Sequence, residues 1–177
     1  MYYQEKGDNI MEKVDIYNRF REKTGKTKYR NELEVGEYRI STHIWLFNYD
    51  GKLLVQKRSL KEDKFPGFWA QTGGGVKAGM TSMETVFEEC KEELNVEVDE
   101  QNLFYVASYT REKDIVDVWV VKQRIDLTKI TLQADEVEEV RLVTFDEFDS
   151  MIEQGIVVPS INPSYSLVKN YLLVYNN

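Results

Sequence analysis

A run of glycines followed by closely spaced glutamates is the part of this chain best suited to chemistry. Residues 73–75 are all glycine, a residue that lets the backbone turn tightly and approach a ligand closely. Glu89, Glu92 and Glu93 follow at helical spacing, where like charges crowd on one side and repel. Mg²⁺ or Mn²⁺ would relieve that repulsion, because both prefer carboxylate oxygens. The alternative is a solvated acidic helix face.

A helix between the glycines and Asn95 must position these glutamates. Thr81 or Ser82 can cap its N-terminus, the helix runs to about Leu94, and Asn95 suits its C-terminal end. The helical period predicts a core face opposite the glutamates. The residues of that core face are Met83, Phe87, Cys90 and Leu94.

The remaining chain alternates short strands and helices within one domain. Alternating or apolar runs predict strands at residues 14–17, 37–47, 52–57, 103–109 and 115–121, and residues 133–144 predict an acidic loop and then a strand. Capping and breaking residues predict helices at 145–154 and 164–173, the last one after Pro163. Residues 19–34 are polar and aperiodic, which predicts an irregular exposed segment. Residues 1–11 are expected to be a flexible extension of a single domain over 12–177.

Composition limits the classes of partner. With 177 residues, 42% of them hydrophobic, the chain can bury one sizeable core. Its net charge of −8 gives no support for a nucleic-acid surface. With a single Cys, the chain cannot form an internal disulfide. The sequence contains no long apolar run of the kind that would indicate a signal peptide or a membrane span. We therefore expect a cytoplasmic protein with no membrane or nucleic-acid partner, and its oligomeric state stays open, with a homodimer as the commonest assembly.

Two other reactive residue types are interpreted as structural. His43 stands on a predicted strand without a neighbouring arrangement that would make it a nucleophile's base. Cys90 falls on the apolar face of the glutamate helix, where a buried inert thiol is expected.

The glycine turn and the glutamates together resemble the Nudix box. With Gly74 at its first position, Glu89, Glu92 and Glu93 fall on the three metal-site glutamates of that box. The match departs at three places: Met80 replaces a Glu, Glu88 replaces an Arg, and Asn95 replaces a closing Gly. Because a Glu and an Arg are lost together, we hypothesise that they normally pair. If these departures limit the reaction, Met80→Glu plus Glu88→Arg should raise turnover.

The resemblance extends over roughly residues 12–150 and points to one branch of the superfamily. Segments 45–47, 51–55, 57–58, 65–69 and 135–137 look like the branch related to isopentenyl-diphosphate isomerase. This implies a Nudix-type α/β/α sandwich, an α/β fold with a mixed curved sheet. The isomerase itself has a Cys at the glycine turn and several metal-site histidines. This chain has neither, so isomerase activity is not expected.

What the resemblance implies for function is a Mg²⁺-dependent or Mn²⁺-dependent hydrolase of a small nucleoside-diphosphate-like or related organic diphosphate. The alternative is a catalytically impaired protein that binds such a ligand. The implied metal ligands are Glu89, Glu92, Glu93 and Asp117. The implied catalytic groups are Glu92, Glu93 and Glu136, and the implied substrate contacts are Arg58, Trp69 and Gly74. From residue type alone, Asp117 could instead face solvent from an edge strand, and Trp69 could instead be core packing.

Overall fold

A mixed six-stranded sheet forms the centre of the protein. The computed structural model describes residues 12–175, so the predicted extension over 1–11 lies outside the described residues. The strands of the sheet are β3 (Arg39–Phe47), β4 (Leu53–Arg58), β5 (Trp69–Ala70), β6 (Leu103–Arg111), β7 (Asp114–Lys122) and β8 (Val137–Val143). Their order is β5-β4-β3-β7-β6, with β8 also paired to β4. β3 and β7 are parallel and the other pairs antiparallel, which confirms the predicted mixed sheet.

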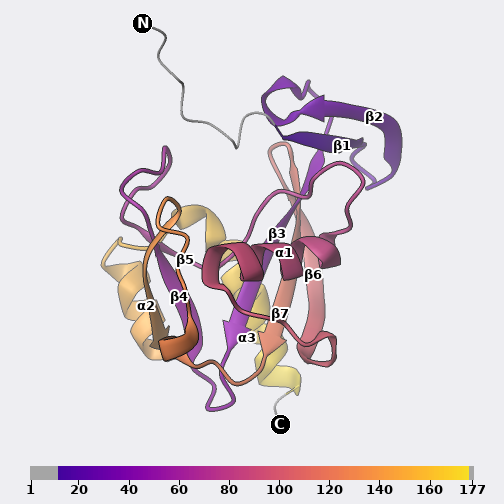
Figure 1. The fold of residues 1–177 in the computed structure, drawn as a ribbon. Helices are drawn as coiled ribbons and strands as arrows, with labels where there is room; N and C mark the ends of the chain where they lie inside the picture. Colours follow the sequence, from indigo (N-terminus) through magenta and orange to yellow (C-terminus); the bar gives the residue numbers. More distant parts are fainter. Residues whose placement is uncertain (1–11, 176–177) are drawn as a thin grey trace, which may run out of the picture.

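Helices cover both faces of this sheet (Figure 1). α1 (Ser82–Leu94) crosses one face, and α2 (Phe145–Glu153) and α3 (Asn162–Tyr175) lie on the other. All nine residues of β3 are buried, because its alternating side chains enter two different cores. Ile44 and Leu46 pack under α1, whereas Trp45 and Phe47 pack with α2 and α3. The α/β/α sandwich is therefore confirmed.

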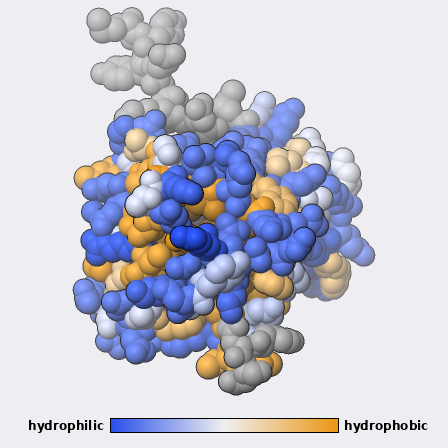
Figure 2. Space-filling model, turned by 60° about the horizontal axis from the view of Figure 1, so that its bottom comes forward, coloured by the Kyte–Doolittle hydropathy of each residue, from blue (hydrophilic) through white to orange (hydrophobic). Residues whose placement is uncertain are grey.

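One face of the protein is mainly polar (Figure 2). On the face that Figure 2 shows, hydrophilic residues cover most of the surface and hydrophobic residues are exposed in patches between them. None of the helices in residues 12–175 is long and apolar enough to cross a bilayer.

An N-terminal hairpin stands outside the main sheet (Figure 1). β1 (Lys13–Tyr17) and β2 (Lys23–Tyr29) pair as a separate two-stranded sheet. The prediction of an irregular segment over 19–34 is wrong here, because β2 and a 3-10 helix (Arg30–Glu32) occupy much of it. The first five residues of β2 are exposed on both faces, so its sequence lacks the alternation that identifies a half-buried strand.

Most other predicted elements lie close to their predicted positions. The exception at the C-terminus is α3, which begins at Asn162, so Pro163 stands in its first turn instead of preceding it. Three further 3-10 helices join the elements: Glu100–Asn102, Leu127–Lys129 and Pro159–Ile161.

Candidate functional site

Helix α1 is fixed at both ends by the residues that the sequence indicates. Thr81 is the N-cap: its side chain accepts from the Glu84 N–H, and the Glu84 carboxylate accepts from the Thr81 N–H in return. Asn95 ends the helix in the left-handed conformation, with φ of 54°. These caps set where along the helix each glutamate stands.

The rotation of α1 differs from the prediction. Val86, Cys90 and Leu94 form its buried stripe, while Met83 is 36% exposed. Glu93, expected on the face opposite the core, is only 5% exposed. Glu92 remains exposed, so the glutamates span the boundary between the buried and solvent sides of the helix.

Glu93 is held inward by a chain of polar side chains. Gln56 Nε2, from β4, donates to Glu93 Oε2 at 3.0 Å. The same amide accepts at Oε1 from Thr72 Oγ1, also at 3.0 Å. Gln56 and Thr72 are themselves buried, so this chain fixes both the position of Glu93 and the orientation of the amide.

The glycine loop, residues 73–81, brings its backbone against Glu89. A Cβ added to Gly74 would stand 1.8 Å from Glu89 Oε1, and one added to Gly73 would stand 2.2 Å from the carbonyl oxygen of Thr42. The Gly74 carbonyl accepts from the Thr42 N–H at 2.8 Å, which pins the loop to β3. Glycine is therefore needed at both positions for close approach.

Burial and mutual repulsion raise the pKa of several of these carboxyl groups. Burial, then repulsion from Glu136 and Glu92, raises the pKa of Glu89 to about 8. Burial and the neighbouring Glu89 raise the pKa of Glu93 well above its usual range, against the opposing hydrogen bond from Gln56. Burial, then Glu62 and Glu92, also raises the pKa of Glu136. The carboxyl groups thus share a site in which negative charge is poorly compensated by protein.

A hard divalent cation fits this set of donors. Carboxylate oxygens are the ligands that Mg²⁺ and Mn²⁺ prefer, and a cation would remove the repulsion that raises these pKa values. Within residues 12–175, no three Asp, Glu, His or Cys side chains are already arranged to hold a metal ion. Repulsion keeps uncompensated carboxylates apart, so binding requires side-chain rotation, for which the partly exposed Glu92 and Glu89 have room.

Glu136 reaches the glutamates of α1 from a separate segment. The N–H groups of Thr131 and Gln133 donate to the carbonyls of Leu94 and Glu93 at 3.1 Å each, so this segment is attached to the end of α1. Ser59 N–H donates to the Glu136 carbonyl at 2.8 Å, which ties the same segment to the end of β4. We call Glu89, Glu92, Glu93 and Glu136 the carboxylate cluster.

Arg58 lies at the edge of the carboxylate cluster and is held by two hydrogen bonds to neighbouring residues. Its Nη2 donates to Glu62 at 2.7 Å and its Nε to the Lys64 carbonyl at 2.9 Å. It still contributes positive charge to the site, since it lowers the pKa of Glu136. A guanidinium has five N–H donors, so these two hydrogen bonds do not prevent contact with a diphosphate.

Two predicted site residues are elsewhere. Trp69 is buried in the core under α2 and α3, beneath the guanidinium of Arg141 at 4.5 Å, so we assign it to packing. Asp117 is neither solvent-facing nor joined to the carboxylate cluster. Both of its oxygens accept from Arg21 of the N-terminal hairpin. β3 lies between its strand, β7, and the β4 strand that carries Gln56.

Two of the three departures from the box, Glu88 and Met80, make contacts of their own. Lys77 Nζ lies 2.9 Å from Glu88 Oε2, so an ion pair joins the glycine loop to α1 with a carboxylate on the helix and a cation on the loop. Met80 packs against the apolar cluster that contains Tyr17 and Val76. A charged side chain at position 80 would have to leave or disrupt this cluster.

We predict that the Lys77–Glu88 pair tolerates exchange of its charges. Lys77→Glu places two carboxylates together and is expected to destabilise the fold by about 1 kcal/mol, because both groups are partly exposed. Lys77→Glu plus Glu88→Lys should recover most of that loss, as measured by urea unfolding. If the double variant is no more stable than Lys77→Glu alone, the pair does not join loop and helix.

The structure changes the result expected for the double variant that restores the box residues at positions 80 and 88. Met80→Glu introduces a charge into the apolar cluster, and Glu88→Arg faces Lys77. We therefore expect Met80→Glu plus Glu88→Arg to lower stability instead of raising turnover.

His43 and Cys90 are structural, as predicted. Ser164 Oγ donates to the Ile161 carbonyl, so the Nδ1 of His43 donates to Ser164 Oγ at 2.8 Å. Burial, with nearby Arg111, lowers the pKa of His43 to about 3. Cys90 is fully buried, and burial raises the pKa of its thiol.

Comparison with known proteins identifies relatives of this chain in sequence and in fold. The sequence matches the NUDIX domain family over residues 37–159. It is 35% identical over 151 residues to lin0387 of Listeria innocua, an "uncharacterized Nudix hydrolase", covering 84% of this chain and 89% of that protein. Isopentenyl-diphosphate Delta-isomerase of Salmonella typhi is 33% identical over 119 residues, 65% of each chain. The crystal structure of DR0079 from Deinococcus radiodurans aligns with a TM-score of 0.73 at 21% identity, covering 89% and 98% of the two chains, which establishes a shared fold.

Proposed function

The chain belongs to the Nudix family and is a hydrolase of pyrophosphate bonds, and from this premise we propose that it uses Mg²⁺ or Mn²⁺ to cleave a small organic diphosphate. Glu89, Glu92 and Glu93 would hold the cation. The observation that carries the proposal is the carboxylate cluster set against the glycine loop. Burial and the neighbouring carboxylates raise the pKa values of Glu89 and Glu93.

Each residue of the site has a role in this proposal. A bound divalent cation would polarise the diphosphate and lower the pKa of a water. Gln56 holds the Glu93 carboxylate in a single orientation, and Gly74 leaves room for Glu89. Glu136 comes from a different segment and accepts the proton of the attacking water. The water oxygen then bonds to phosphorus as the bridging P–O bond breaks. Arg58 would contact the diphosphate oxygens.

Catalysis is favoured over the alternative of an impaired ligand-binding protein. That alternative arose from the losses at positions 80 and 88, and the Lys77–Glu88 pair supplies a loop-to-helix contact in their place. Isomerase chemistry is not proposed, since residues 72–75 contain no Cys and His43, the chain's one histidine, is buried and bonded to Ser164. We further propose a cytoplasmic location, and a homodimer as the assembly to test first.

Metal dependence and substrate class are tested together. We expect phosphate or monophosphate release from at least one member of a panel of nucleotide sugars, dinucleotides, nucleoside triphosphates and prenyl diphosphates, in the presence of Mg²⁺ or Mn²⁺. EDTA should abolish the release, and excess Mg²⁺ should restore it. Diphosphate binding measured by calorimetry, without release from any substrate, would favour the ligand-binding protein.

A further inference from the structure

The N-terminal hairpin lies against the glycine loop although it is outside the residues matched by the family. The match begins at residue 37, whereas the hairpin spans residues 13–29. Alternate residues of β1 face the loop. The Lys13 carbonyl accepts from the Ala78 N–H at 2.8 Å, the Asp15 Oδ2 accepts from the Gly79 N–H at 3.0 Å, and Tyr17 shares a cluster with Met80.

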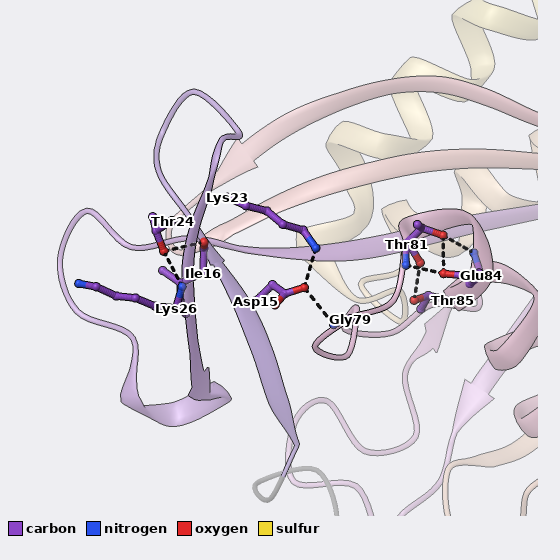
Figure 3. A network of polar contacts seen from close by, with 9 residues as sticks. All are labelled: Asp15, Ile16, Lys23, Thr24, Lys26, Gly79, Thr81, Glu84 and Thr85. Atoms are coloured by element: carbon purple, nitrogen blue, oxygen red, sulfur yellow. Dashed lines mark hydrogen bonds and ion pairs between the residues drawn. The ribbon is translucent and has the colours of Figure 1, made fainter.

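Asp15 is the side chain that joins the hairpin to the loop (Figure 3). Its Oδ2 also accepts from Lys23 Nζ of β2 at 2.8 Å, so one carboxylate oxygen connects both strands of the hairpin to Gly79. Figure 3 shows Asp15 between Lys23 and Gly79, with the N-cap Thr81 just beyond.

The hairpin is itself anchored to the main sheet. Arg21 donates hydrogen bonds to both carboxylate oxygens of the buried Asp117 on β7, with Nη2 at 2.6 Å from Oδ2. Tyr17 and Tyr38 exchange backbone hydrogen bonds at 2.7 and 2.9 Å, which join β1 to the segment that leads into β3. Asp117 is buried and Arg21 is partly exposed, and the two hydrogen bonds between them favour one geometry, so the hairpin can act as a fixed support.

The loop needs such a support between its two fixed ends. At one end, Val76 N–H donates to the Ile40 carbonyl at 3.0 Å, and at the other Thr81 caps α1. Between them Gly79 is exposed and has φ of 86°. Glycine adopts this conformation readily but also adopts many others, so the residue does not fix the backbone by itself. Movement here would displace Lys77, whose Nζ lies 2.9 Å from Glu88 Oε2 on α1 and whose positive charge lowers the pKa of Glu89.

We propose that the N-terminal hairpin braces the glycine loop and that Asp15 is the positioning residue of this brace. The proposal rests on the proposed function, because the braced loop carries Gly74 and leads into the glutamate helix. It assigns Asp117 a role as the hairpin's anchor on the sheet.

The test compares Asp15→Ala with Asp15→Asn and Lys26→Ala. Asn retains an oxygen that can accept from Gly79, and Lys26 is an exposed lysine of the same hairpin whose side chain does not contact Asp15. Hydrogen exchange of the peptide covering 74–81 is measured together with kcat and KM at saturating Mg²⁺.

Asp15→Ala is expected to speed exchange in residues 74–81 about tenfold and to lower kcat several-fold with little change in KM. Asp15→Asn should recover most of both losses, and Lys26→Ala should match the wild type. Unchanged exchange in Asp15→Ala, or an equal effect of Lys26→Ala, would overturn the proposal. The exchange measurement decides about the brace even if no substrate is hydrolysed, whereas absence of turnover in the wild type bears on the proposed function alone.

Discussion

Replacing Glu93 with glutamine is expected to lower metal-dependent turnover by about 10² to 10³-fold, the range for loss of a charged group that acts at the reacting centre. The neutral amide removes a carboxylate from the cluster but keeps its shape. Gln56 can still donate to the remaining side-chain oxygen, so the surrounding polar chain stays satisfied. Because burial raises the pKa of Glu93, a neutral side chain is no harder to bury, and the free energy of unfolding should not fall.

The measurement is kcat for phosphate release together with urea unfolding. Glu97→Gln is the matched control, because it removes the same charge just beyond α1 from a side chain that is 85% exposed. The control should retain wild-type turnover. Wild-type turnover in Glu93→Gln as well would remove Glu93 from the site assignment.

The limits of helix α1 could be predicted, but its rotation could not. Its caps are local: Thr81 pairs with Glu84, and Asn95 adopts the left-handed conformation. The inward position of Glu93 depends on Gln56, a residue of β4 that is distant in sequence. The sequence shows that Gln56 is a polar residue on the same face of a buried strand as Leu54 and Arg58. It does not show that Glu93 is the partner of Gln56.

The N-terminal hairpin shows a second limit of prediction. β2 is polar on both faces, so its pairing with β1 leaves no periodic pattern in the sequence. Asp117 was expected to join the metal site or to face solvent, and it does neither, because its partner Arg21 comes from this unpredicted element. The ion pair between Lys77 and Glu88 could not be predicted either, because it depends on how the glycine loop lies against α1.

Alanine at the three consecutive glycines is expected to separate fold from function. The backbone at these positions has no positive φ, so space alone decides the outcome. In Gly73→Ala the new Cβ would meet the Thr42 carbonyl oxygen at 2.2 Å, and the central strand β3 would have to shift. We expect a loss of about 3 kcal/mol in the free energy of unfolding.

Gly74→Ala meets a movable group instead. Its Cβ would collide with the end of the Glu89 side chain, which can rotate away at little cost in stability. Displacement of Glu89 should weaken Mn²⁺ binding, measured by calorimetry, and lower turnover about tenfold or more. Gly75→Ala is the control for metal binding, because its Cβ would meet Arg39 Nη1 at 2.7 Å and no atom of Glu89. Arg39 is buried and paired with Asp114, so this variant is expected to lose some stability.

The three glycine variants are to be compared in both stability and metal binding. Loss of metal binding at position 74 but not at positions 73 and 75 would show that glycine is needed at position 74 to leave space for Glu89, and not for backbone freedom. Wild-type Mn²⁺ affinity in Gly74→Ala would exclude Glu89 as a ligand, since displacement of its carboxylate is the direct consequence of the added methyl group. Wild-type stability in Gly73→Ala would mean that the loop does not lie as close to β3 as the Thr42 contacts require.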